Sequence, residues 1–469
     1  MSTTELPVTR IDSKLRKNRD WLKIWTGGTA LTLGDQIFAT SLTLWVGAVL
    51  SDGESWGPTA MSGVLLAQAI PPILISVIAG TFVDRWNKRH VMIVASAISA
   101  LTCAALLVAV SLAIPTAPLL ATVCCAVFLL AAAQQFFNPA NISTLYDVVP
   151  VNQRTEAVGK LLASTQVILM IGPPLAAPLL FGLGMQGSIV VDLASFALAC
   201  TLAWRLRVKL SLSESASRGN LATDFLNALR FIRRMKILRL SLGTFFFFSL
   251  CASSTTAVSY FYITERLHCS PAAVGAFGTV LGIGAMVGSY GARKKIAQDR
   301  SHHAYAAGLV LFGVLSGLYS KMESISIGGV VYFLWGMAYG IIAYSLEAIA
   351  ATSVPQRLIG RVSSLIAPMQ GIAAVIGLLV GSYFAHQGVA GASIGFSALS
   401  VDPLRGVYRL VCLITVAAGC YAALRFRDTS LHHAEVEHAG EAEVEGHSIA
   451  MDTVGTKDVE WNIRKPFLL

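Results

Sequence analysis

The chain has 469 residues, of which 55% are hydrophobic and only 13% are charged, and its mean hydropathy is +0.65. Soluble domains carry roughly 25% charged residues, so this composition excludes a water-soluble globular enzyme. A collagen-like or mostly disordered chain is also excluded, because the 40 glycines follow no three-residue period and the charge is low over the length. The composition therefore indicates a polytopic membrane protein.

The N-terminal residues 1–20 are polar and basic, and we expect a cytoplasmic tail rather than a removable signal peptide. Seven of the eight cysteines lie in apolar runs, where a thiol behaves as a small hydrophobic group. Cys269 alone is predicted to be exposed in a loop. The cysteines therefore predict no disulfide framework.

Apolar runs bounded by charged or turn residues predict twelve membrane-spanning helices. The first six lie near residues 22–49, 61–83, 90–113, 118–137, 157–183 and 188–206. The second six lie near residues 237–262, 272–291, 303–319, 326–346, 362–385 and 406–425. No segment shows the two-residue alternation of a membrane barrel, so the expected fold class is an all-α integral membrane protein with two six-helix bundles.

The basic residues predict how the chain is oriented. With the loops assigned alternately to two sides, 28 Lys and Arg residues fall on one side and four on the other. The positive-inside rule then places both termini in the cytoplasm, in an inner (plasma) membrane. The net charge of +9 is thus a signal of topology, and no nucleic-acid partner is expected.

Changes in composition predict five parts. They are a cytoplasmic tail at 1–20, a bundle at 21–206, a linker at 207–236, a bundle at 237–425 and a tail at 426–469. The second half of the linker has an amphipathic pattern typical of a helix on the membrane surface. The last part holds nine acidic and four basic residues and is predicted to be disordered. Its histidines fit no standard metal spacing, so we expect a solvated tail.

The two halves carry a weak internal repeat. Val149-Pro150 with Arg154 follows the fourth predicted span, and Val354-Pro355 with Arg357 follows the tenth, at an offset of 205 residues. Two parallel repeats of six spans, with the substrate held between them near mid-membrane, are typical of many secondary transporters.

The loop after the second span reads Gly80-Thr-Phe-Val-Asp84-Arg85-Trp-Asn-Lys88-Arg89. This string resembles the G-x-x-x-D-R-x-G-R-R signature of the major facilitator superfamily, with Asn87 in place of the second glycine. Further matches are Val191 to Phe196, Ser270 to Gly275, and Val354 to Val362, in the expected order on the predicted helices. Over residues 20 to 425 the chain is similar to this superfamily, and within it to the drug and macrolide efflux-like branch.

The resemblance implies a gating motif at the cytoplasmic side. Asp84 is placed to accept hydrogen bonds from a helix N-terminus, and the neighbouring cations are placed to bridge to Asp147 or to helix C-termini. The alternative is that these charges only mark topology, which explains Lys88 and Arg89 but not Asp84. The predicted gating set is Gly80, Asp84, Arg85, Lys88, Arg89, Asp147 and Arg361.

Asp35 is the main candidate for proton coupling. It lies twelve residues after Lys23, or roughly 18 Å along a helix, which places it near the bilayer centre. A carboxylate there must face a cavity, find a partner or hold a proton. A structural hydrogen bond between helices is the alternative. Asp192, near the outer end of the sixth span, and Glu347, at the cytoplasmic end of the tenth, are secondary candidates. The alternative is interfacial structure for Asp192 and simple solvation for Glu347.

Polar and aromatic residues on the cavity-lining helices of the family predict a pocket for a sizeable amphiphilic solute. They are Gln36, Gln134, Gln135, Asn138, Ser253, Thr256, Tyr260, Trp335 and Tyr339. In the fifth span, a segment that resembles the Gly-Pro-rich motif of antiporters predicts a helix kink, for which packing is the alternative. Its residues are Gly172, Pro173, Pro174 and Pro178. The Gly-x-x-x-Gly pairs at 278/282, 284/288 and 377/381 predict close helix packing.

The sequence has no Walker A loop, nucleophile elbow, HExxH helix or paired CxxC, so we expect no catalytic site, cofactor or bound metal, and no enzyme. The predicted function is proton-coupled export of a hydrophobic or amphiphilic small molecule by a monomer in the lipid bilayer. A siderophore, lysolipid or metal exporter of the same fold stays open as an alternative, and so does a non-transporting receptor or scaffold that signals through its tail.

Overall fold

The structure is a computed structural model that describes residues 15, 17–50, 56–112, 114–150, 153–206, 236–296, 300–353, 356–389 and 402–426. All secondary structure in this part of the chain is helical. Ten of its helices are long and apolar enough to cross a membrane. By contacts between Cα atoms the chain forms two compact units, Met1–Ala422 and Ala423–Leu469, and the helices α2 to α12 all belong to the first.

The first half begins with α2 (Arg19–Trp45), which continues as the π-helix η2 (Val46–Leu50). It is followed by α3 (Gly57–Arg85), α4 (Lys88–Ser111), α5 (Thr116–Val148) and α6 (Arg154–Trp204). Helix α6 covers both the fifth and the sixth predicted spans. It is interrupted at Gly184, where φ is 70° and ψ is 179°, a left-handed conformation that favours glycine.

The second half consists of α8 (Lys236–Phe261), the π-helix η4 (Tyr262–Arg266), α9 (Pro271–Lys295), α10 (Ser301–Tyr319), α11 (Ile325–Ser353) and α12 (Gln356–Val389), followed by the helix Pro403–Phe426. All twelve predicted spans overlap one of these helices. The fold class predicted from the sequence is confirmed, with the fifth and sixth spans joined at Gly184.

Two asparagines start helices at the same end of the first half. The Asn18 side chain accepts hydrogen bonds from the amides of Asp20 and Trp21 at the start of α2, and Asn87 does the same for Arg89 at the start of α4. Asparagine is a favoured N-cap residue. The departure of Asn87 from the family signature therefore has a local structural role.

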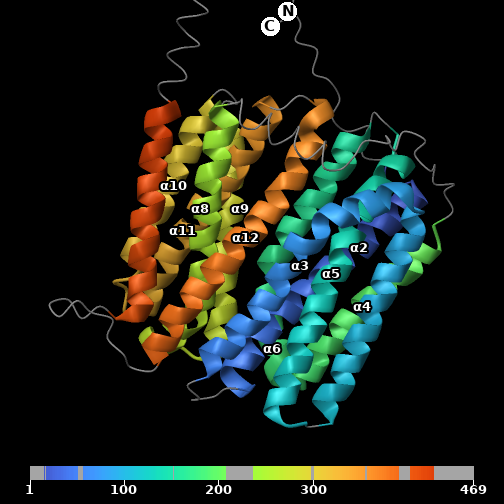
Figure 1. Cartoon of the computed structure of the whole chain (residues 1–469), viewed down its shortest axis with the longest axis horizontal. Coiled ribbons are helices and arrows are strands. Elements are labelled where there is room, and N and C mark those ends of the chain that lie inside the picture. The colour runs from blue at the N-terminus through green and yellow to red at the C-terminus, as the bar shows by residue number, and fades with distance from the viewer. Residues whose placement is uncertain are drawn as a thin grey trace, which may run out of the picture. The chain divides into compact units, whose positions relative to one another are not determined.

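In each half the helices pack along one another (Figure 1). Helix α6 packs along α2 and α4, α5 packs along α3 and α4, and α11 packs along α9 and α10, while α8 packs along α12. The two halves meet where α3 contacts α12 and where α6 contacts α9. The Pro-Gly segments and glycine pairs that the sequence singled out lie on several of these contacts.

Glycines allow the closest helix contacts. A Cβ atom on Gly284 or Gly288 of α9 would overlap the backbone of α11, and one on Gly377 of α12 would overlap the backbone of α8. These contacts confirm the packing role expected for the pairs 284/288 and 377/381. Gly336 and Gly340 of α11, which the sequence analysis did not select, form the matching face toward α9.

The exposure predicted for Cys269 is wrong. The residue is buried, because its amide and thiol bond to the carbonyls of Ile263 and Leu267 in the turn after η4. All eight cysteines are free thiols. The predicted linker at 207–236, except its last residue, and nearly all of the tail at 426–469 lie outside the described residues, as does the Val354-Pro355 pair.

Candidate substrate and proton site

A cavity of about 310 Å³ lies in the first half, between α2, α3 and α5. Its apolar wall includes Phe38, Leu42, Val64, Leu65, Val127 and Leu130. Its polar wall consists of Thr32, Asp35, Gln36, Thr43, Gln68, Gln134 and Gln135. Four of these were predicted, namely Asp35, Gln36, Gln134 and Gln135. Gln68 was missed because a single amide in the long apolar run of α3 gives no pattern.

Among the described residues that line this cavity, Asp35 is the one with an ionisable side chain. It lies near the middle of the span Arg19–Leu50, and the Gln134 amide on α5 donates a hydrogen bond to its carboxyl group. The side chain is half-buried. This carboxyl group therefore lies within the bundle, lines a cavity and has a neutral hydrogen-bond partner.

Asp192 of α6 packs against α2 and is fully buried. The Cys103 thiol of α4 is 3.5 Å from its carboxyl group, and the Ser195 hydroxyl donates to its backbone carbonyl at 2.7 Å. Its Oδ1 atom packs against Gly34, where a Cβ atom would come within 2.9 Å of it. The second part of α6 thus places Asp192 inside the bundle, in contact with α2 and α4.

Several basic groups gather at one end of the first half, which we call the basic end: Lys23, Lys88, Arg89, Arg154 and Arg205. Here Lys88 forms an ion pair with Asp147, with 2.7 Å between Nζ and Oδ2. Arg89 donates to the backbone carbonyl of Trp204 at the end of α6, and Lys23 donates to that of Arg205 at 2.8 Å. These contacts tie the ends of α2, α4, α5 and α6 together.

The bridges expected from the gating motif are thus present for Lys88 and Arg89. The side chains of Asp84, Arg85 and Arg361, and the surroundings of Gly80, lie outside the described part of the structure. The gating role of the whole set stays a prediction. Glu347 is exposed on α11.

The remaining cavity candidates do not line the cavity between α2, α3 and α5. Asn138 and Thr256 are exposed, and Ser253 packs against Gly377. Trp335 is buried in an aromatic cluster with Phe312, Tyr319, Tyr332 and Tyr408. Tyr339 contacts Phe248, with ring centroids 5.7 Å apart. Trp335 and Tyr339 therefore contribute to packing within the second half.

Contacts that join the halves away from the basic end include one at Gly47 and one at Gly275. The buried ring of Tyr260 on α8 lies against Gly47 of η2, where a Cβ atom would come within 2.6 Å of the ring. The carbonyl of Pro173 on α6 lies 2.9 Å from the Cβ position of Gly275 on α9. Gly172 in turn packs against the Gln36 side chain. The Gly-Pro segment, including Pro174 and Pro178, keeps helical backbone angles, and the break in α6 lies at Gly184 instead. The segment contacts both the cavity-lining Gln36 and the second half.

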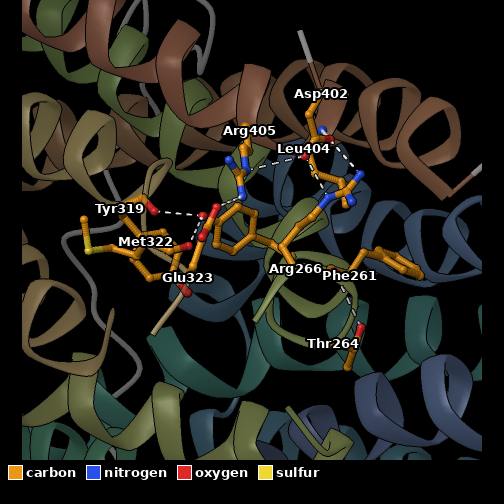
Figure 2. Close-up of polar contacts among 10 residues, drawn as sticks. Phe261, Thr264, Arg266, Tyr319, Met322, Glu323, Asp402, Leu404 and Arg405 are labelled. Carbon is orange, nitrogen blue, oxygen red and sulfur yellow. Dashed lines mark hydrogen bonds and ion pairs between the residues drawn. The ribbon is translucent and has the colours of Figure 1, made fainter. Parts of the chain in front are cut away.

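A polar cluster at the start of the helix Pro403–Phe426 was not predicted (Figure 2). Arg266 forms an ion pair with Asp402 at 2.7 Å, and Arg405 forms one with Glu323 at 3.0 Å. The Tyr262 hydroxyl donates to the carbonyl of Tyr319 at 2.8 Å. The cluster ties η4, the turn after α10 and the last helix together. Within the described residues, no three His, Cys, Asp or Glu side chains are placed to hold a metal ion.

Solved transporter structures share this fold. A bacterial homologue of the human lysosomal transporter Spinster, in an inward-facing and unoccupied conformation, is 15% identical with a TM-score of 0.67, covering 88% of this chain and 98% of that one. A point mutant of the nucleoside transporter NupG is 12% identical with a TM-score of 0.63, covering 87% and 100%. The chain therefore has the fold of a multi-pass membrane transporter.

The family model of the Major Facilitator Superfamily matches residues 24–378, and the chain belongs to this superfamily. Among curated relatives, the MFS-type transporter YkuC of Bacillus subtilis (strain 168) is 21% identical over 365 residues, which cover 74% of this chain and 81% of YkuC. The superfamily resemblance seen in the sequence is confirmed. The efflux-like branch stays a prediction.

Proposed function

We propose that this transporter exports a hydrophobic or amphiphilic small molecule, such as a drug-like compound or secondary metabolite, in exchange for protons. The observation that carries the proposal is the position of Asp35, a carboxyl group near mid-span in a cavity whose other polar groups are uncharged. In an apolar site such a group is far more stable when it holds a proton or pairs with a cation. Protons and substrate then compete for one group.

The cavity wall supports an amphiphilic substrate. Four glutamine side chains on its wall offer hydrogen bonds without charge, namely Gln36, Gln68, Gln134 and Gln135. The aliphatic and Phe38 side chains offer apolar contact. Ligand sites of this kind bury the apolar body of a ligand and use few polar groups for orientation. A highly charged solute would lose its hydration here with one carboxyl group as compensation.

Alternating access gives the ion pairs and the helix contacts separate roles. The Lys88–Asp147 pair belongs to the basic end, which the positive-inside rule assigns to the cytoplasm of an inner membrane, together with both termini. The Gly47–Tyr260 and Pro173–Gly275 contacts join the halves away from that end. We propose that opening the opposite side separates these contacts, while the charged contacts hold the ends of the first-half helices together as one body.

The test is substrate-driven proton flux in proteoliposomes, screened with lipophilic cations, macrolides, siderophores, lysolipids, nucleosides and divalent metals. Asp35→Asn is compared with Asp20→Asn, a matched change on the same helix at a residue that pairs with Lys23 near the helix end. We expect one amphiphilic class to drive protons in the opposite direction, with coupling lost in Asp35→Asn and kept in Asp20→Asn. Transport without proton movement, or coupling that survives in Asp35→Asn, would refute the proposed mechanism.

A further inference from the structure

An apolar groove of about 560 Å³ opens on the surface of the first half, between α3 and α4. Both helices pack along α5 and barely touch each other, so α5 forms the floor of the groove. The floor includes the small side chains of Ala132 and Ala133, and Phe82 of α3 and Val94 of α4 form part of its walls. Phe82 and Val94 are exposed, so the groove faces the surrounding membrane.

The mouth of the groove lies at the basic end. Trp86, directly after α3, and His90, in the first turn of α4, line it there, and both are exposed. The N-terminus of α4 adds the positive end of its helix dipole. Arg89, next to His90, donates a hydrogen bond to the backbone carbonyl of Trp204. Because this carbonyl carries no charge, the contact does not neutralise the Arg89 guanidinium. Among the described residues that line the groove, none is acidic.

We propose that this groove binds an anionic phospholipid from the leaflet at the basic end. One acyl chain lies over the alanine floor of α5, and the headgroup phosphate lies at the first turn of α4 beside His90. The apolar walls match the chain, and the positive charge at one end of the groove matches the phosphate. This site is separate from the cavity of Asp35 and does not depend on the substrate or coupling ion.

Trp86 provides a direct probe, because its ring forms part of the groove. The full-length protein is placed in nanodiscs of phosphatidylcholine, and phosphatidylglycerol with brominated acyl chains is added in steps. Brominated phosphatidylcholine is the comparison lipid. The fluorescence of wild type minus that of Trp86→Phe isolates the quenching of this one tryptophan. We expect brominated phosphatidylglycerol to reach half-maximal quenching at about a fivefold lower lipid fraction than brominated phosphatidylcholine does. This factor corresponds to the attraction of one basic group near the membrane surface for an anionic lipid.

Two variants test the two ends of the site. Ala132→Leu fills the floor, and Ala417→Leu makes the same change at an exposed position on the helix Pro403–Phe426. His90→Glu places a negative charge at the mouth. We expect the preference for the anionic lipid to disappear in Ala132→Leu and His90→Glu and to persist in Ala417→Leu.

Three results would overturn the proposal. One is equal quenching of Trp86 by the two brominated lipids in the wild type. Another is a preference that persists in both Ala132→Leu and His90→Glu, since the anionic lipid would then bind elsewhere. The third is an absence of quenching by either lipid, which would mean that protein, such as a second copy of the chain, covers the groove.

Discussion

The ion pair of Lys88 and Asp147 joins two charges that each lie at an unfavourable helix end. Lys88 is the first residue of α4, where the helix dipole is positive, and Asp147 is next to the last residue of α5, where the dipole is negative. Each charge is therefore disfavoured alone and compensated by the other. We expect that neutralising one member, by Lys88→Met or Asp147→Asn, harms the protein more than neutralising both.

The burial of the pair sets the size of the effect. The side chains are 10% and 19% exposed, with 2.7 Å between the charged atoms. Exposed pairs contribute about 0 to 1 kcal/mol, while removing one partner of a fully buried pair costs about 3 to 5 kcal/mol. A mostly buried pair lies between these limits, so each single variant should lose about 2 kcal/mol. The double variant should recover more than half of that loss.

The assay is a double-mutant cycle followed by thermal unfolding in detergent, with Lys160→Met as a control in the more exposed pair of Lys160 and Glu156. The two single variants should unfold a few degrees below wild type, and the double variant and the control should stay near it. Losses that add up in the double variant would show that the two charges do not compensate each other. The reasoning from the helix ends would then be wrong.

Three more predictions follow from described contacts. Gly336→Ala should destabilise the protein by about 1 to 3 kcal/mol, because its Cβ would overlap the Leu281 carbonyl; Gly329→Ala, with no neighbour within 4 Å, should be neutral in the same thermal assay. Asp402→Asn should cost more than Glu323→Gln, because Asp402 pairs with Arg266 and accepts from the Leu404 amide while Glu323 is 75% exposed; equal unfolding temperatures would contradict this. Burial raises the pKa of the Cys269 thiol, so the reactive thiolate forms at higher pH than usual; maleimide labelling of a variant with Cys269 alone should be slow at neutral pH and rise with pH, and rapid neutral labelling would contradict this.

The helices could be predicted because lipid imposes one requirement on every span, a run of about 20 apolar residues. The break at Gly184 falls in the gap predicted between residues 183 and 188, where the apolar run weakens. The tertiary contacts carry no such signal. Arg266 and Asp402 are 136 residues apart, and their pairing depends on how three separate connections meet. Nothing in either local sequence indicates it.

Predicted residues of the first half line the cavity, while those predicted in the second half do not, for a physical reason. Glutamines and a carboxyl group are costly in a span unless they face a cavity or a partner, so Gln36 and Gln134 point to a polar wall. Aromatic rings carry no such cost, and a tryptophan suits a packed core as well as a cavity wall. Trp335 lies in the core of the second half. The pattern of residues could not distinguish the two environments.

Asp35 and Asp192 are the same residue type at similar depth in neighbouring helices, yet their surroundings differ. Asp35 lines a cavity, while Asp192 is fully buried behind Gly34 and contacts the Cys103 thiol. A coupling group must meet the proton and the substrate in turn, which requires access from the cavity. Asp192 has no such access without separation of α2 from α6, the most extensive helix contact in the first half. The coupling hypothesis therefore belongs to Asp35, and the structure gives Asp192 a place in the packing between these two helices.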